Sequence, residues 1–401
     1  MISEADALDH ILGATAPPSR PPESLPLLAA RQRYAATTLT APVPLPRFDQ
    51  SAMDGYALRS ADATTTTKFR VVGEQPAGPD RRLTISPGTA IRIFTGAPLP
   101  ADADCVIRQE DVTRSGNEIT LNEPPAPGEF IRRAGADLCR HQTILSPGEP
   151  ITPTRIALFA ALGISDVSVH SLPTIGLIST GDEIKSKIQN PKSEIQDGEI
   201  LDSNTPLLVA VLAAAGFPVT TTTHADDTPT ALAAALDSTV GCDAVILTGG
   251  VSVGEHDHVR ATLRDRGTRT DLWRIAVKPG KPFLFAHSPT TTYFGLPGNP
   301  VSTFVTALLF VLPGLRRLAG ASPGHSRNLF TSLPTATEIT NPGDRPHYLR
   351  GTIDVGNFHP APLQESHALA SLARSNALLR VAPSTTLPPG SQAPCIILPG
   401  F

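Results

Sequence analysis

A short apolar run followed by a glycine-rich loop constrains the fold of this 401-residue chain more than any other stretch. The run Ala244–Leu247 has the length and the branched side chains of a buried parallel strand. Three glycines follow it, Gly249, Gly250 and Gly254. A helical pattern then begins at His258. Because glycines let backbone amides approach an anion closely, this order of elements predicts a phosphate-sized pocket at the edge of an α/β sheet.

The glycine spacing matches neither the dinucleotide fingerprint nor the P-loop. Asp257 stands at the exit of the loop, and a carboxylate beside a bound phosphate usually acts through a metal ion. The alternative is an aspartate that caps the helix after a tight turn. The loop taken alone leaves both interpretations open.

Apolar runs alternate with helical patterns on both sides of this loop, which is typical of a βα architecture. We expect strands over residues 174–179, 219–223, 244–247, 275–277 and 293–296, and helices over 203–214, 228–236 and up to residue 312. Polar residues recur at the carboxyl ends of these strands, where ligands of open α/β sheets bind. The position of these residues favours a binding or catalytic function more than any one of them does.

Short alternating segments before and after this region predict small β domains, one from Phe69 to about Glu123 and one after about Pro323. A helical pattern near the start, with apolar residues from Ala5 to Leu12, and a capped helix over 152–162 complete the expected elements. The chain is therefore expected to hold several domains.

Composition and charge exclude several classes of protein. A net charge of -4 argues against a nucleic-acid binder, which needs a basic face. Four dispersed cysteines without a C-x-x-C pair indicate a reducing compartment and neither a disulfide scaffold nor a zinc site. The amino terminus lacks the apolar core of a signal peptide, and the longest apolar run, Phe304–Pro313, is too short to span a bilayer. We expect a soluble, cytoplasmic protein that binds no membrane.

Eight motifs, in order along the chain, together resemble the molybdopterin molybdenumtransferase family of molybdenum-cofactor biosynthesis, which is similar to the C-terminal domain of gephyrin. They are Ser51–Ala57, Thr95–Pro100, Ser179–Glu183, Asp202–Asn204, Thr248–Asp257, Lys278–Pro282, Leu296–Ser302 and Ser375–Leu378.

The resemblance implies an α/β plus β, multidomain fold. Residues 1–43 and 139–171 would form an elongated linker and dimerisation region, 44–138 an inserted β domain, 172–322 a molybdopterin-binding three-layer α/β domain and 323–401 a C-terminal β-barrel-like domain. It also implies a homodimer, in which one subunit's inserted β domain completes the active site on the other subunit's α/β domain.

The implied reaction inserts molybdenum from molybdate into adenylylated molybdopterin, with Mg²⁺-dependent release of AMP. A glycine loop at a helix N-terminus and two lysines suit the phosphates of that substrate. Cleavage of its pyrophosphate needs a metal ion to screen charge, which suits the carboxylates. The implied partners are these small molecules, a second copy of the chain, and transient contacts with the molybdopterin adenylyltransferase and acceptor molybdoenzymes.

The resemblance implies catalytic roles for Asp54, Thr95, Asp137 and Glu183, and metal binding by Asp226, Asp257 and Glu183. The residues that would bind the substrate are Thr248, Gly249, Gly250, Ser252, Gly254, Lys278, Lys281, Pro297, Pro300, Arg350 and Ser371. Lys281, Arg350 and Ser371 would line a molybdate site, since two cations and a hydroxyl suit a tetrahedral dianion. Glu183 would serve the metal, the pterin or proton transfer. The structural alternatives are helix capping for the aspartates, a turn for Asp54 and solvated surface lysines.

Two other functions compete. The related molybdopterin adenylyltransferase shares the glycine loop and the α/β domain, but it normally lacks the β domains found here. A non-catalytic molybdopterin-binding or scaffold protein is the third interpretation. The extra β domains favour the insertion enzyme over the adenylyltransferase, and the intact acidic positions favour it over the scaffold.

Overall fold

The computed structural model describes residues 1–16, 20–185, 194–250 and 258–398. The chain divides into two compact units. The first comprises Met1–Thr37, Pro147–Ile156 and Asp166–Phe401, and the second comprises Thr38–Ser146 and Ala157–Ser165. The predicted domain boundaries at 43, 138, 171 and 322 stay predictions.

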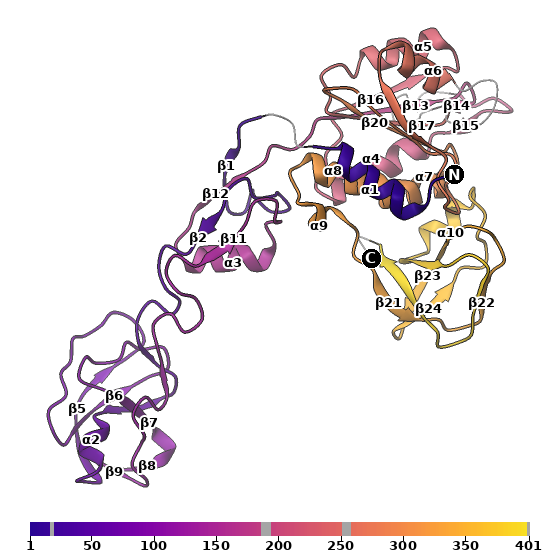
Figure 1. Cartoon of the computed structure of the whole chain (residues 1–401). Helices are drawn as coiled ribbons and strands as arrows, with labels where there is room; N and C mark the ends of the chain where they lie inside the picture. The colour runs from indigo at the N-terminus through magenta and orange to yellow at the C-terminus, as the bar shows by residue number, and fades with distance from the viewer. Residues whose placement is uncertain (17–19, 186–193, 251–257, 399–401) are drawn as a thin grey trace. The chain divides into compact units, whose positions relative to one another are not determined.

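A six-stranded sheet forms the centre of the first unit (Figure 1). Its order is β16 (Thr221–Ala225), β13 (Ile175–Thr180), β17 (Ala244–Thr248), β20 (Thr292–Leu296), β19 (Leu284–His287) and β18 (Arg269–Trp273). The first four strands are parallel, and β19 and β18 are antiparallel to their neighbours. Every residue of β13 and β17 is buried, as expected for parallel strands covered on both faces.

Helices cover both faces of this sheet, so the predicted three-layer α/β domain is confirmed (Figure 1). Alternate residues of β17 face opposite layers: Ile246 packs with α1 (Glu4–Ala14), α4 (Asn204–Ala214), α7 (Pro300–Thr306) and α8 (Leu312–Leu318). Val245 packs with α5 (Pro229–Asp237) and α6 (His258–Asp265) on the other face. This alternation follows from the two-residue period of a strand.

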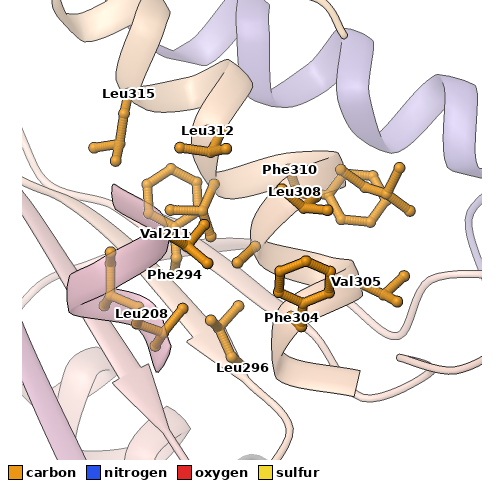
Figure 2. Close-up of a cluster of buried hydrophobic side chains, with 14 of the residues drawn as sticks. Leu208, Val211, Phe294, Leu296, Phe304, Val305, Leu308, Phe310, Leu312 and Leu315 are labelled. Carbon is orange, nitrogen blue, oxygen red and sulfur yellow. The ribbon is translucent and has the colours of Figure 1, made fainter. Parts of the chain in front are cut away.

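The larger of the two cores lies between β20, α4 and one long helix (Figure 2). That helix runs through α7, a π-helical turn at Ala307–Val311 and α8, so it continues past the expected end at Leu312. A proline inside a helix removes a backbone hydrogen bond and crowds the preceding turn. The wider π-helical turn lies directly before Pro313. Residues Pro300–Leu318 are apolar and long enough to cross a membrane, but 89% of the helix window is buried, as in a core helix.

Two expectations about strands need correction. Ile275–Val277 is not a strand, because the amide of Val277 donates back to the carbonyl of Ile275 and the segment folds on itself. The antiparallel strands β18 and β19 occupy the flanking segments, which the sequence pattern did not single out.

The carboxyl-terminal part of the first unit is an antiparallel sheet with the order β21, β27, β25, β23, β24. These strands are Thr331–Pro334, Gln392–Ile397, Ala377–Val381, His347–Asp354 and Asn357–Pro360, and β22 (Ile339–Asn341) pairs separately with β26 (Thr385–Leu387). One short helix, α10 (Leu369–Ala373), precedes β25 in this part of the chain.

The second unit contains the small β domain expected between Phe69 and Glu123. Its six-stranded sheet has the order β7 (Cys105–Arg108), β4 (Gly55–Leu58), β6 (Thr89–Ile93), β5 (Lys68–Gln75), β9 (Glu118–Leu121), β8 (Val112–Ser115). Phe69, Ile107 and Ile119 pack in one core of this unit, and Ile91 and Ile93 pack in another. The antiparallel pair β3 (Gln50–Ser51) and β10 (Ile131–Arg132) lies outside that sheet.

Candidate functional site

A cavity of about 600 Å³ opens in the first unit at the carboxyl ends of β13, β17 and β20. The strand register brings these ends together, because Ser179 pairs with Thr248 and Thr248 pairs with Leu296. The lining therefore comes from loops far apart in sequence. The lining residues are Ser179–Gly181, Glu183, Ile184, Ile200–Asn204, Asp227, Thr248–Gly250, Pro282, Pro297–Pro300, His367 and Leu369.

The glycine turn after β17 passes close to the end of β13. Gly249 and Gly250 have φ angles of +85° and +64°, which side chains rarely adopt. A Cβ atom on Gly249 would lie 2.7 Å from the carbonyl oxygen of Thr180, and one on Gly250 would lie 2.9 Å from the Thr180 hydroxyl. Only glycine therefore fits at either position. The predicted residues Ser252, Gly254 and Asp257 lie outside the described residues.

The turn between β20 and α7 forms a second wall of the cavity and includes the predicted Pro297 and Pro300. It lies against the glycine turn, since a Cβ on Gly298 would be 3.8 Å from the Cα of Gly249. Asn204 holds it by donating from Nδ2 to the Gly298 carbonyl at 2.6 Å.

Two cavity residues that were not among the predicted site residues carry polar atoms with nothing to bind. Among the described residues, Asn204 Oδ1 and Asp202 Oδ2 are buried without a hydrogen-bond partner. A buried polar atom without a partner is costly and usually marks a ligand or water site. Both residues belong to the motif Asp202–Asn204, so the motif itself was the signal that could have identified them.

The acidic side of the cavity is formed by Glu183 and Asp227. The backbone amide of Asp227 donates to the carboxylate of Asp182 at 2.8 Å, which ties the ends of β13 and β16 together. Burial raises the pKa of Asp227, and the negative charges of Asp182 and Glu183 raise it further. This site therefore holds negative charge that the protein leaves largely uncompensated.

Asp226, which the resemblance singles out, is placed differently from its neighbour Asp227. Its side chain is 69% exposed, and Oδ1 lies 3.9 Å from His224 Nε2. It borders a small recess with Asp227 and His258, while Asp227 also lines the main cavity. Of the two adjacent aspartates, Asp227 is the better placed to contact a ligand in the cavity.

The acidic side has the chemistry for Mg²⁺ without being a complete cage. Among the described residues, no three His, Cys, Asp or Glu side chains converge to hold a metal ion. Magnesium usually binds through one or two carboxylates, several waters and the phosphates of a substrate. The raised pKa of Asp227 fits this arrangement, because a nearby cation would offset both the burial and the repulsion that raise it.

Arg350 and Ser371 meet at one carbonyl group. Arg350 Nη2 donates to the carbonyl oxygens of Leu363 at 2.8 Å and Glu365 at 3.1 Å, and Ser371 Oγ also donates to Leu363 at 2.8 Å. Arg350 is fully buried, and burial lowers its pKa. Its Nε and Nη1 atoms have no hydrogen-bond partner within the described ranges. A buried guanidinium with free donors suits a small anion.

Lys278 and Lys281 lie on an exposed turn whose next residue, Pro282, lines the cavity. Gly280 between them has φ +120°, and a Cβ there would be 2.5 Å from the Cγ2 atom of Thr306. The turn is therefore packed tightly against α7. The side chains of the two lysines are not part of the lining, so the structure leaves them beside the site.

The remaining predicted residues lie in the second unit. Asp54 Oδ1 accepts hydrogen bonds from the amide and the hydroxyl of Thr95, both at 2.8 Å. The hydrogen bond from the Thr95 amide contributes most to lowering the pKa of Asp54, followed by the hydrogen bond from the Thr95 hydroxyl. Asp137 lines a hollow of about 800 Å³ on the same unit. The structure thus joins Asp54 to Thr95 and places Asp137 in a hollow whose lining includes neither of them.

Three family models match successive parts of the chain. Residues 2–163 match the MoeA N-terminal region (domain I and II), residues 176–317 a probable molybdopterin binding domain, and residues 332–398 the MoeA C-terminal region (domain IV).

Curated relatives and solved structures agree with these matches. A molybdopterin molybdenumtransferase of Synechococcus elongatus is 36% identical over 389 residues, which cover 94% of each chain. One from a Nostoc species is 35% identical over 370 residues, covering 89% of this chain and 84% of the relative. The crystal structure of the molybdopterin biosynthesis moeA protein of Pyrococcus horikoshii matches with a TM-score of 0.82 and 26% identity, over 99% of this chain and 100% of that one.

Proposed function

The chain belongs to the molybdopterin molybdenumtransferase family, and we propose that it inserts molybdenum from molybdate into adenylylated molybdopterin with Mg²⁺-dependent release of AMP. The observation that carries the proposal is the cavity lined by the Gly249–Gly250 turn together with Glu183 and Asp227. It combines a place for phosphates with a place for the cation that accompanies them.

In this proposal the phosphates of the substrate lie on the glycine turn, where the absence of Cβ atoms lets the backbone approach them. Asn204 and Asp202 supply polar atoms that orient the substrate in the cavity. These contacts hold the scissile pyrophosphate in one position, which is the main way in which proteins accelerate phosphoryl transfer.

Asp227 and Glu183 would hold Mg²⁺ together with the substrate phosphates, and Asp257 stays a predicted ligand of the same ion. When bound, the ion neutralises charge that develops on the phosphate oxygens. The proposal replaces Asp226 by Asp227 as the main ligand, because Asp227 lines the cavity and Asp226 is exposed.

Molybdate is proposed to bind at Arg350 and Ser371, with Lys281 supplying a second positive charge. The free donors of the buried Arg350 support this assignment. We further propose that the protein is a cytoplasmic homodimer, in which Asp54, Thr95 and Asp137 of one subunit act on the cavity of the other. Contacts with the adenylyltransferase that supplies the substrate and with acceptor molybdoenzymes belong to the same proposal.

The test incubates purified protein with adenylylated molybdopterin, Mg²⁺ and molybdate. AMP release together with cofactor that activates an apo-molybdoenzyme is the expected result. Adenylylation of free molybdopterin by ATP would instead identify an adenylyltransferase, and binding without turnover would identify a scaffold.

Two adjacent variants make the test specific to the site. Asp227→Asn should lower the rate of AMP release by roughly 100-fold, since loss of a metal ligand weakens transition-state charge stabilisation. The matched control Asp226→Asn should change it less than about threefold. Equal losses in both variants would contradict the assignment of Asp227.

A further inference from the structure

The hollow on the second unit has a lining that the proposed roles do not explain. Its volume is about 800 Å³, and two segments border it, residues 45–50 and 131–137. The two segments run antiparallel, with Arg132 opposite Gln50 and with the Asp137 amide donating to the Leu45 carbonyl at 3.0 Å. The hollow therefore rests on a hydrogen-bonded backbone and not on a loose loop.

Three arginines line this hollow and only one carboxylate does, that of Asp137. Arg133 is already paired, since its Nη1 lies 2.6 Å from Asp49 Oδ2. The hydrogen bond from the backbone amide of Ala134 contributes most to lowering the pKa of Asp49, and the hydrogen bond from Arg133 lowers it further. In the part of the chain that the structure describes, neither Arg47 nor Arg132 has a carboxylate partner. Two guanidinium groups thus remain available to an anion.

An exposed aromatic ring completes the lining. Phe48 lies between Arg47 and the paired Asp49 in sequence and leaves 45% of its surface exposed. A flat heterocycle can stack on such a ring while its phosphate contacts the guanidinium groups.

We propose that this hollow binds a phosphorylated planar heterocycle, with Phe48 stacking on the ring and Arg47 and Arg132 binding the phosphate. The inference rests on the proposed function for the identity of the ligand, because adenylylated molybdopterin offers this chemistry at both ends. Its adenylate half and its pterin-phosphate half are the two sources. The side-chain amide of Gln50 is placed to hydrogen-bond an edge of either ring.

The experiment measures the affinity of the full-length protein for two probes, AMP and molybdopterin, by titration calorimetry. Arg47→Gln, Arg132→Gln and Phe48→Leu should each weaken binding of one probe by about tenfold. Phe48→Tyr should restore it, because tyrosine keeps the ring. Arg114→Gln, which removes an exposed arginine of the same unit outside the hollow, should leave both affinities within twofold.

Salt dependence separates a phosphate contact from a general loss of structure. Raising the salt concentration should weaken binding of the probe to the wild-type protein. The dependence of affinity on salt should be shallower in Arg47→Gln and should stay as in the wild type in Phe48→Leu. A structural defect would not distinguish the two variants in this way.

The outcomes are distinct. Weakened AMP binding assigns the adenylate half to the hollow, and weakened molybdopterin binding assigns the pterin half. If the variants bind both probes as the wild-type protein does, or if neither probe binds the wild-type protein, the inference is overturned. Release of AMP by the wild-type protein is measured separately. The proposed function can therefore be confirmed when binding at the hollow is refuted, and binding at the hollow can be confirmed when the proposed function is refuted.

Discussion

At the scale of single residues, Gly249 is held by two constraints that can be separated experimentally. Its φ angle of +85° and the 2.7 Å approach to the Thr180 carbonyl both oppose a side chain. Gly163 has a similar φ angle of +78°, but no atom lies within 4 Å of the position that its Cβ would take. Gly163→Ala should therefore cost about 1 kcal/mol of stability through backbone strain alone.

Gly249→Ala should cost more, about 2–4 kcal/mol, because the backbone must also move away from Thr180. Chemical denaturation followed by circular dichroism would compare the two. Similar losses in both variants would show that the contact with Thr180 relaxes freely.

The carboxylate of Asp227 should reduce stability at neutral pH. Its folded-state pKa is raised, so the folded protein holds that proton more tightly than the unfolded chain does, and the ionised form is destabilising. This destabilisation is lost as the pH falls through the raised pKa toward the ordinary value of 3.8. Asp227→Asn should therefore raise Tm by about 1 °C at pH 7, and by less near pH 4.

Differential scanning calorimetry at the two pH values would test this, with Asp226→Asn as the exposed control. A lower Tm for Asp227→Asn at pH 7 would contradict the expected sign.

The sequence predicted some of the residues that line the cavity but not their exact neighbours. The motifs contain the glycine turn and Glu183, which line the cavity, whereas Arg350 was assigned by resemblance outside those motifs. Asp226 and Asp227 are adjacent and chemically identical, so only the path of the chain after β16 distinguishes them. Arg47 and Phe48 belong to no functional pattern in the sequence, and only their shared hollow draws attention to them.

At the scale of elements, α1 is fixed to the carboxyl-terminal sheet by one partly buried acid. Glu4 accepts a hydrogen bond from the Tyr348 hydroxyl at 2.5 Å and pairs with Arg380 at 3.0 Å. Burial and the neighbouring Glu4 carboxylate raise the pKa of Tyr348, so the phenol remains a donor at neutral pH. Glu4→Gln should lower the free energy of unfolding by about 1–3 kcal/mol.

A second acid on the same helix is the matched control. Asp9 pairs with Arg327, and both side chains are about half exposed. Asp9→Asn should therefore change stability by less than about 0.5 kcal/mol. Denaturation curves for the two variants should differ clearly, and equal losses would remove the special role of Glu4.

The helices and strands could be predicted from the sequence wherever the hydrophobic pattern had one dominant period. The capped helices α4 and α5 and the apolar strands β13, β17 and β20 begin and end within a few residues of the expected positions. Strands β18 and β19 were missed although each pairs with the next strand along the chain, β18 with β19 and β19 with β20. The π-helical turn before Pro313 depends on tertiary packing, which no helical pattern reports.

At the scale of the whole molecule, the two units have separate cores and should unfold separately. Phe310 is fully buried in the first unit and Phe69 in the second. Replacing either by alanine should cost about 3–5 kcal/mol in its own unit. Calorimetry should show two transitions, with Phe310→Ala lowering one and Phe69→Ala lowering the other. A single transition shifted by both variants would show that the units unfold together.

The order of the domains could be predicted from the ordered motifs, and the three-layer core from the βα alternation. The grouping of α1 with the α/β core could not, because it depends on contacts such as Ile11 with residues some 300 positions later in the chain.

The bond between Glu4 and Arg380 joins residues 376 positions apart, so the ribosome makes one of them long before the other. Helix α1 is translated well before β23 and β25, the strands that hold its acid. Its apolar face, with Ala7 and Ile11, packs in the α/β core beside α8 and stays exposed until that segment has been made. A nascent chain of this protein should offer that face to a ribosome-associated chaperone until α8 has been translated and folded against it.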